Sequence, residues 1–562
     1  MKQGKRMLVS LIAALVVGAV YFYLALPAIN LQDMDFYIWV GVMCLVYLIT
    51  WLSKGSREER GEQKVIFVDG NAVRIDPTGF APGTFKSLPA KLPLIIVGLM
   101  AVVIVVGSLI SWKGFRAQDY YDLLPVTTGD FTEDVAEISY NEIPMLDEAS
   151  AQQLGRRTLG NISAEGAYSD LVSQFEVSYD YTQINYQGRP VRVSPLIYGD
   201  LIKWFNNRSE GLPGYIVVDM VTQEADLILL EQGIKYTPDE HFGRYLPRHI
   251  RFQYPTFMFG EATFELDEEG HPYWVCPRVV KRIGLFGGED IHGAVLVDAV
   301  TGESTYYEEV PTWVDRVYLA QLIIEQYDNH GTLVNGFINS IFGEKGCTVT
   351  TDGYNYIVID DDVYLYTGVT STGTDESNVG FILSNQRTKE TKFYAVSGAE
   401  EYSAMSSAQG AVQHLSYTAT FPILLNISDQ PTYFMALKDS AQLVKMYSMV
   451  NVRDYQLTAT GQTVAECQQN YEKLLVGYGI EVDSGVELEN QKTVTGTIAE
   501  IRSAVIEGTS WYYVRLNGEN WYYSLSAADN ASVVLLDVGD SVSIDVDETQ
   551  TDMIRTGLLT NK

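Results

Sequence analysis

An uncharged apolar run at residues 92–112 constrains this chain more than any other feature. A helix needs about 20 mostly apolar residues to cross the hydrocarbon layer, because each residue rises about 1.5 Å. Lys91 and Lys113 bracket the run, and Trp112 ends it, where an amphipathic ring prefers the headgroup level. The run therefore predicts a transmembrane helix.

Two further apolar runs precede it, at residues 7–29 and 36–52. The first follows Lys2, Lys5 and Arg6, as the apolar core of a signal peptide would. It is longer than such a core, and no clear Ala-x-Ala cleavage site follows it, so an uncleaved anchor is favoured. Residues 1–112 are predicted to be a membrane anchor with three spans and a loop at 53–91, which contains a hairpin around Asp69-Gly70-Asn71.

Lysine and arginine set the expected orientation. The N-terminus carries three basic residues, the connector at 30–35 carries none, and the loop at 53–91 carries seven. Basic short loops stay in the cytoplasm. The N-terminus and the 53–91 loop are therefore expected in the cytoplasm, and everything after Lys113 is expected outside it.

The body that follows the spans is strongly acidic. The whole chain has a net charge of −32, and the first 112 residues contribute +3, which leaves −35 for the rest. Such a charge repels nucleic acid, so no nucleic-acid partner is expected. The four cysteines are far apart, and the six histidines lack metal-site spacing, so buried free thiols and no zinc site are expected.

The fold class predicted for the body is α+β, built from tandem helix-on-antiparallel-sheet units. Three segments share the pattern Asp/Asn-x-x-Thr-x-Glu, beginning at Asp219, Asp298 and Asn385, with apolar strand residues on both sides. An Asp or Asn at a hairpin tip accepts backbone N–H bonds, and Thr assists. A helical stretch and a strand pair recur between the tips, although a fourth copy lacks the tip pattern. Tandem packing would bury both faces of such units.

These observations define the expected domains. Residues 113–145 are predicted to be an irregular acidic stalk, 146–310 a first pair of units, 311–480 a second pair, and 491–562 a small β-barrel. The helices of the four units are expected at 147–160, 239–250, 313–342 and 398–415, and a further helix from Thr463 to Gly477.

The repeated hairpin resembles the PepSY-like domain, a helix packed on a short antiparallel sheet. The similarity is closest at Val297, Asp298, Thr301, Gly302 and Glu303, and it weakens at the Asp219 and Asn385 copies. It would cover roughly residues 147–460. A chance β-turn signature remains an alternative, since such turns are common. The resemblance implies a non-catalytic module, typical of membrane-tethered regulators or inhibitors that act outside the cell.

The last 70 residues contain short strand-like runs and an Asn517-Gly518 turn, and they resemble an OB- or SH3-like barrel. About half of the aromatic residues on its strands must point outward. An exposed aromatic face binds a glycan or a protein partner in many OB folds, whereas a fully covered face would be structural. The candidate binding residues are Trp511, Tyr513, Trp521 and Tyr523.

Two charged groups are further candidates. Oxygen-rich loops can hold calcium, although the spacing here is not that of an EF-hand; the possible calcium ligands are Asp360, Asp361, Asp362, Asp375 and Glu376. Arg244, Arg248 and Arg251 form a basic island in an acidic body. They either pair with nearby carboxylates or receive an anionic partner.

Known catalytic signatures are absent from the sequence, including the nucleophile elbow, the H-E-x-x-H helix, the Walker loop and the dinucleotide fingerprint. We therefore expect a membrane-anchored extracytoplasmic binding, scaffold or regulatory protein of the bacterial cell envelope, whose partners are the bilayer and an unidentified envelope protein, with or without oligomerisation. The alternatives are an envelope hydrolase acting on wall or glycan, and a structural subunit of a secretion or conjugation assembly.

Overall fold

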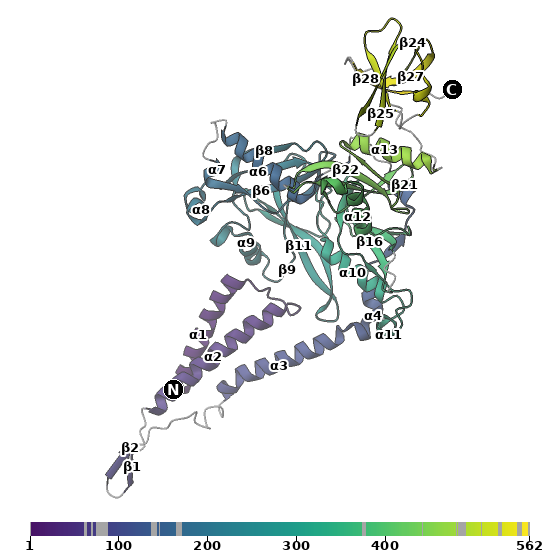
Figure 1. Cartoon of the computed structure of the whole chain (residues 1–562). Coiled ribbons are helices and arrows are strands. Elements are labelled where there is room, and N and C mark those ends of the chain that lie inside the picture. The colour runs from purple at the N-terminus through teal and green to yellow at the C-terminus, as the bar shows by residue number, and fades with distance from the viewer. Residues whose placement is uncertain are drawn as a thin grey trace. The chain divides into compact units, whose positions relative to one another are not determined.

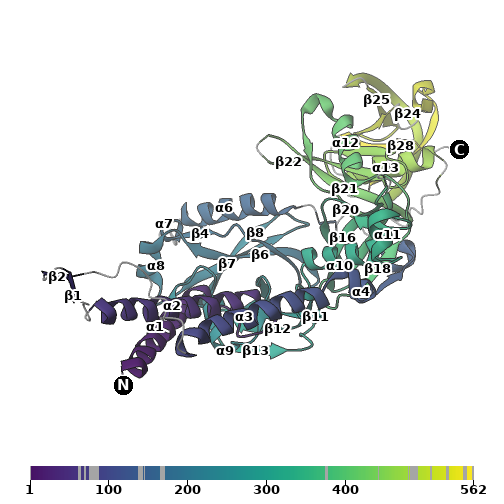
Figure 2. The ribbon, with the colours of Figure 1, turned by 90° about the horizontal axis from the view of Figure 1, so that it is seen from below.

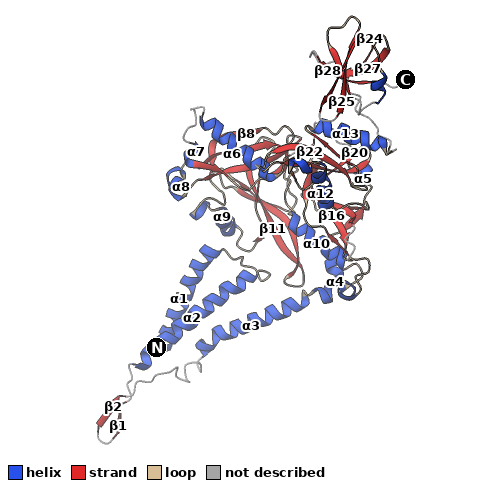
Figure 3. Cartoon of the chain, in the orientation of Figure 1, coloured by secondary structure: helices blue, strands red, loops and turns tan. Residues whose placement is uncertain are grey.

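The computed structural model describes residues 2–60, 65–68, 71–74, 88–136, 143–144, 146–164, 171–373, 378–440, 442–478, 480, 491–506, 509–526, 531–547 and 554–559. The protein is of the α+β class, with three apolar N-terminal helices followed by sheets and a C-terminal barrel (Figure 1, Figure 3). It divides into two compact units, Met1–Ile480 and Glu481–Lys562.

Three helices are long and apolar enough to cross a membrane. They are α1 (Lys2–Ala25), α2 (Met34–Arg60) and α3 (Leu88–Ile110). Most of their apolar side chains face outward, as lipid-facing residues do. The predicted hairpin lies between α2 and α3, where β1 (Val65–Val68) pairs with β2 (Asn71–Arg74). The chain is a membrane-anchored protein.

Four sheets of mainly antiparallel strands follow, and a helix precedes each of them along the chain. The helices are α6 (Glu148–Ala164), α9 (Leu246–Gln253), α10 (Ala320–Thr332) and α12 (Glu401–Ala411). The first sheet contains β4 (Phe175–Val177), β5 (Thr182–Tyr186), β6 (Arg189–Tyr198), β7 (Leu212–Asp219) and β8 (Ala225–Ile234). The second contains β9 (Met258–Phe259), β10 (Thr263–Leu266), β11 (Pro272–Ile283), β12 (Gly287–Asp298) and β13 (Ser304–Tyr307).

The third sheet contains β14 (Thr348–Thr350), β15 (Asn355–Ile359), β16 (Asp362–Ser371), β17 (Asn378–Asn385) and β18 (Thr391–Tyr394). The fourth contains β19 (Thr418–Ala419), β20 (Ile423–Ile427), β21 (Gln430–Lys438), β22 (Val444–Asn451) and β23 (Thr458–Gly461). Figure 2 shows α6 lying along the first sheet.

All four sheets have the same strand order. Two short strands pair side by side along one long strand, which pairs with a second long strand, which pairs with a further strand. This further strand has ten residues in the first sheet and four in each of the other three. The register is also the same: the tip residues Asp219, Asp298, Asn385 and Asn451 lie opposite Val191, Tyr273, Tyr364 and Thr432 respectively. The residue after each tip residue donates its N–H to the carbonyl of Pro190, Pro272, Val363 or Pro431. The body is therefore one unit built four times.

The three predicted tips have one geometry. In each, the Asp or Asn side chain accepts the N–H groups two and three residues on, at 2.8 and 2.9 Å in the first two copies and 2.9 Å for both bonds in the third. The Thr hydroxyl accepts the N–H of the Glu. Gln223, Gly302 and Lys389 take positive φ angles at the same position. The pattern therefore encodes a closed local turn.

The fourth copy uses a variant of the same turn. Asn451 accepts the N–H groups of Arg453 at 2.9 Å and Asp454 at 3.1 Å, and its own N–H donates to the Leu457 carbonyl. The loop is one residue longer, and this length difference hides the fourth tip from the sequence pattern.

Residues 113–136 are not part of an irregular stalk, which the sequence predicted at 113–145. They contain α4 (Lys113–Tyr121), β3 (Val126–Thr128) and α5 (Phe131–Asp134), and β3 adds to the third sheet in parallel with β18. Leu124 is buried in the core of the third unit. The short strand was missed because three residues of pairing across 265 positions leave no local period.

Two of the predicted helices have different bounds. The helix predicted at 239–250 begins only at Leu246. A proline is compatible only with the first turn of a helix, so Pro247 prevents a helix that begins before Tyr245 and Leu246. The 313–342 segment contains α10 and a separate α11 (Phe337–Phe342). The last predicted helix is confirmed as α13 (Val464–Gly477), capped by the Thr463 hydroxyl, which accepts the Glu466 N–H.

Buried polar groups join neighbouring units. Glu265 of the second unit accepts the N–H groups of Asp315 and Arg316, which lead into the third, at 2.8 and 3.1 Å. Lys438 of the fourth unit forms a salt bridge of 2.5 Å with Asp147 at the start of the first. Burial acts to raise the pKa of Asp147, but the Lys438 contact holds this pKa below its usual value. These joints fix the order of the units.

Residues 481–562 contain a closed five-stranded barrel. Its strands are β24 (Gln491–Ile506), β25 (Thr509–Leu516), β26 (Tyr522–Ser526), β27 (Ser541–Asp547) and β28 (Ile554–Leu559), in the order β24-β25-β26-β28-β27. Long β24 pairs with both β25 and β27, which closes the barrel.

Replacing Asp298 tests the tip. Asp298→Ala removes the acceptor of two backbone N–H groups, so we expect the free energy of unfolding to fall by about 1–3 kcal/mol. Asp298→Asn is the matched control, because Asn385 performs the same role in the third unit. Equal loss in both variants, measured by denaturant unfolding of the full chain in detergent, would contradict the acceptor role.

Candidate functional site beside the first membrane span

The segment from Thr237 into α9 separates two hollows of the first two units. It contains the 3₁₀ turn η1 (Phe242–Arg244), and Pro247 starts α9. One side faces a cavity of about 910 Å³, and the other faces a pocket of about 310 Å³. Both volumes fall in the range of small-molecule sites, about 300–1,000 Å³.

The large cavity has walls from three parts of the chain. The first unit contributes Tyr179 and Ile197, the second contributes Phe259 and Trp274, and the end of α1 contributes residues 24–26. The cavity therefore lies where the body meets the first membrane span.

The polar groups of the large cavity are mainly occupied or shielded. Asp239 accepts the N–H of Tyr198 at 2.8 Å, and burial raises the pKa of its carboxyl. The indole nitrogen of Trp274 and the hydroxyl of Tyr181 are buried and have no hydrogen-bond partner among the described residues. Burial raises the pKa of Tyr181, so this hydroxyl stays protonated. The cavity therefore offers mainly aromatic surface, from residues such as Tyr179, Phe259 and Trp274.

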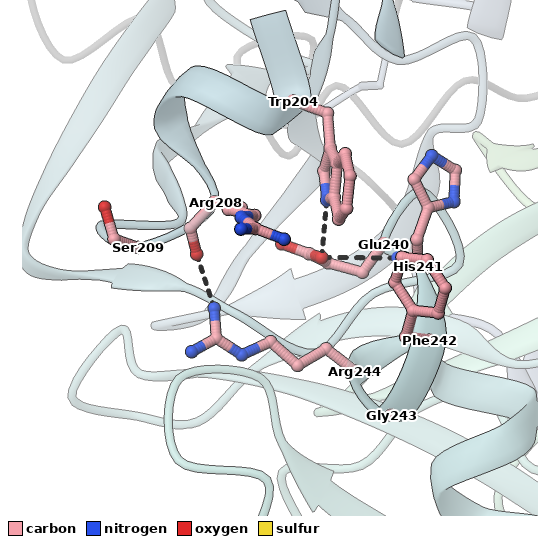
Figure 4. A pocket seen from close by; sticks show the side chains of 8 residues that line it. All are labelled: Trp204, Arg208, Ser209, Glu240, His241, Phe242, Gly243 and Arg244. Carbon is pink, nitrogen blue, oxygen red and sulfur yellow. Dashed lines mark hydrogen bonds between the residues drawn. The ribbon is translucent and has the colours of Figure 1, made fainter. Parts of the chain in front are cut away.

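The small pocket is organised around one buried carboxylate (Figure 4). Glu240 accepts the Trp204 indole N–H at 2.8 Å, the Tyr198 hydroxyl at 2.8 Å and the His241 backbone N–H at 3.3 Å. Trp204 belongs to α8 (Leu201–Asn207), whose N-cap Asp200 accepts the N–H groups of Ile202 and Lys203. Glu240 therefore ties α8 and β6 to the η1 segment, and its oxygens are in use.

The predicted basic island lies in this region, and its arginines donate to backbone carbonyls. Arg244 donates to the Arg208 carbonyl. Arg248 donates to the Tyr23 carbonyl at 3.0 Å and covers the Tyr23 ring at 4.0 Å. Arg251 is buried and donates to the Leu26 carbonyl at 2.9 Å. The last carbonyls of a helix have no intrahelical partner, so Arg248 and Arg251 satisfy the end of α1.

The aromatic residues of the barrel are distributed between its core and its outer face differently from the prediction. Val514 and Tyr523 lie opposite each other and both belong to the barrel core, together with inward-facing Trp521. Tyr523 is 1% exposed, so it was wrongly assigned to the outer face. Successive side chains of a strand point to opposite faces, so Tyr522, which precedes the inward-facing Tyr523, points outward. Pairing across the 517–520 loop decides which residues of β26 face the core. The sequence does not reveal this pairing.

The outer face of the barrel carries Trp511, Tyr513 and Tyr522, all partly exposed, beside one charge cluster. Glu500 accepts bonds from Arg515, Arg502 and the Tyr522 hydroxyl, and these bonds lower the pKa of Glu500 to about 2.

The predicted calcium ligands are not brought together as a metal site. Asp360 and Asp361 form the two-residue turn between β15 and β16, and Asp361 accepts a bond from Asn185 at 2.6 Å. Asp362 is bound by Arg387 at 2.6–2.8 Å and by Asn385 at 2.7 Å. Asp375 and Glu376 lie outside the described residues. In the part of the chain that the structure describes, His, Cys, Asp and Glu side chains form no group of three placed to hold a metal.

The sequence reasoning missed the buried carboxyls. Glu265 and Glu401 are fully buried, and burial raises the pKa of both. Glu401 accepts the Tyr366 hydroxyl at 2.8 Å. An acid within the apolar strand segment TFEL was the available signal for Glu265. The four cysteines are buried free thiols, as predicted.

No model of a known protein family matches this chain, and no curated protein matches it. A search of solved structures returns a crystal structure of a B. megaterium levansucrase mutant, at 10% identity and a TM-score of 0.18, over 76% of this chain and 97% of that one. A likeness at this level carries no argument about fold or activity.

Replacing Arg251 tests the contact between body and span. We expect Arg251→Ala to lower the free energy of unfolding by about 1–3 kcal/mol, because two carbonyls lose a charged donor in a buried place. Arg453→Ala, at an exposed arginine of the fourth tip, is the control. Thermal unfolding in detergent measures both, and an unchanged midpoint for Arg251→Ala would exclude this role.

Proposed function

We propose that this protein is a non-catalytic binding or scaffold protein of the bacterial cell envelope, held by three spans with its body outside the cytoplasm. The observation that carries the proposal is the large cavity between the first two units, walled by the end of α1. The aromatic lining suits recognition of a ligand or peptide segment.

The repeated unit supports the same function. In each copy a helix precedes a mainly antiparallel sheet, and the closing hairpin of the second copy carries the Asp-x-x-Thr-Gly-Glu turn at Asp298. We propose that the four units are PepSY-like modules. The five-stranded closed barrel with a short helix, η3 (Ala531–Leu535), before its fourth strand supports an OB-type module.

The orientation is proposed from charge and connection together. The 26–33 connector binds the body, since the Ile29 N–H donates to the Pro255 carbonyl at 2.7 Å and Asn30 donates to the Thr256 carbonyl. The body and this connector, which carries no lysine or arginine, are thus on one side of the membrane. The basic 53–91 loop then lies on the other side, which the charge rule makes the cytoplasm.

Two alternatives remain as second candidates. An envelope hydrolase would need converging free carboxylates, whereas Asp239 and Glu240 are each occupied by protein donors. A subunit of a large membrane assembly would use the outer surface instead of the cavity, and the crosslinking experiment below separates it from a ligand-binding protein.

Labelling of single cysteines tests the orientation. All four native thiols are buried, so an introduced surface cysteine dominates the signal. We expect Ser403→Cys on α12 to react with a membrane-impermeant maleimide in intact cells, and Ser53→Cys on α2 to react only after permeabilisation. The reverse pattern would invert the proposed topology.

Photocrosslinking in native membranes tests the binding role. A photoreactive phenylalanine in place of Tyr179, which lines the cavity and is 60% exposed, is expected to give an adduct of discrete mass. The matched control is Tyr455, 50% exposed on the fourth tip. Adducts at position 455 and none at 179 would contradict binding at the cavity, and self-adducts at either position would favour the assembly subunit.

A further inference from the structure

Two groups of exposed apolar side chains lie on the body beside the membrane spans. The α8 patch consists of Leu201, Ile202, Phe205, Phe242 and Phe252, which are 57–74% exposed. The α11 patch consists of Phe115, Ile338, Ile341 and Phe342, which are 49–83% exposed. Isolated exposed apolar residues are normal on soluble proteins, but contiguous groups mark an interaction surface.

The α8 patch is connected to the end of α1 by successive contacts. Arg244 holds the last turn of α8 to η1, and Arg248 holds η1 to α9 through the Phe242 carbonyl at 2.7 Å. Arg248 and Arg251 then hold α9 to α1. The Phe252 ring packs edge-on against Phe22 at 5.6 Å, so this patch continues the surface of the span.

The α11 patch is connected to the end of α3 in the same way. The Ser111 hydroxyl, just after α3, accepts the N–H groups of Leu285 and Phe286, each at 2.9 Å. Trp112 packs against Phe115 at 5.1 Å and against Phe337 of α11 at 5.2 Å. Figures 1 and 3 show α11 beside α4, at the end of α3.

The charges beside the patches also suit a phospholipid surface, although the body as a whole is acidic. Arg208 is exposed and lies over the Phe205 ring at 4.4 Å. Lys113 and Lys345 flank the α11 patch and are exposed. A cation above apolar side chains is the arrangement of interfacial anchors, where the charge meets lipid phosphate and the apolar part enters the acyl boundary.

We propose that the α8 patch and the α11 patch are interfacial anchors, inserted into the outer leaflet of the bilayer that the three spans cross. The occupant of both surfaces is anionic phospholipid. The body then rests on the membrane at two places, and the opening of the large cavity, which residues 24–26 line, lies at the bilayer surface. This inference rests on the membrane anchor and, for the choice of leaflet, on the proposed orientation, and it is independent of the proposed binding function.

The test uses the full chain in proteoliposomes of phosphatidylcholine and phosphatidylglycerol. An environment-sensitive fluorophore is attached to Phe205→Cys, Phe342→Cys or the control Tyr402→Cys, which is 51% exposed on α12, away from the spans. Lipids spin-labelled on the acyl chain quench only probes inside the bilayer. We expect quenching at 205 and 342 to exceed that at 402 at least about twofold, because interfacial segments enter about 5–10 Å.

A second pair of probes, at Ile202→Cys and Ile341→Cys, guards against misfolding of one variant. Arg208→Gln with Lys345→Gln is expected to reduce the gain in quenching that phosphatidylglycerol gives, whereas Arg453→Gln leaves it unchanged. Equal quenching at all positions would overturn the proposal. Blue-shifted emission without lipid quenching, rising with protein density, would overturn it in favour of contact between copies of the chain.

Discussion

The hydrogen bonds at the ends of the membrane helices are the constraint on which the remaining arrangement depends. The last carbonyls of α1 have no partner within the helix, and Arg248 and Arg251 of the body supply charged donors to them. At the end of α3, the Ser111 hydroxyl accepts two N–H groups from the β11–β12 hairpin. These bonds position α9, and α9 in turn positions both hollows of the candidate site.

The second constraint is the closed turn that ends each long hairpin. One side chain accepts two N–H groups, and the register of the two long strands follows from it in all four sheets. Units of this size have little core of their own, so buried polar joints such as Glu265 with the 315–316 backbone hold them in order. A repeated unit with fixed joints offers surfaces and inter-unit cavities, which suit binding.

Much of the fold could be read from local patterns. The three spans, the hairpin at 65–74, the three tips and α13 are each encoded by residues close together in the chain. The β3 strand could not be predicted, because its partner lies 265 residues away. The side assignment of Tyr523 failed for a related reason, since pairing with β25 decides which face a residue of β26 takes.

The sequence predicted which residue types lie at the candidate site, but not what these residues contact. The basic island was recognised, but its role follows from carbonyls of α1 that lie 225 positions away along the chain. The acidic run at 360–362 resembled a calcium loop until Arg387 and Asn185 were seen to bind two of its carboxylates. The sequence by itself determined the membrane anchor, the acidic body and the repeated turn, because apolar length and turn chemistry act over a few residues. Only the tertiary structure decided which polar groups are satisfied by the protein, because long-range pairing brings donor and acceptor together.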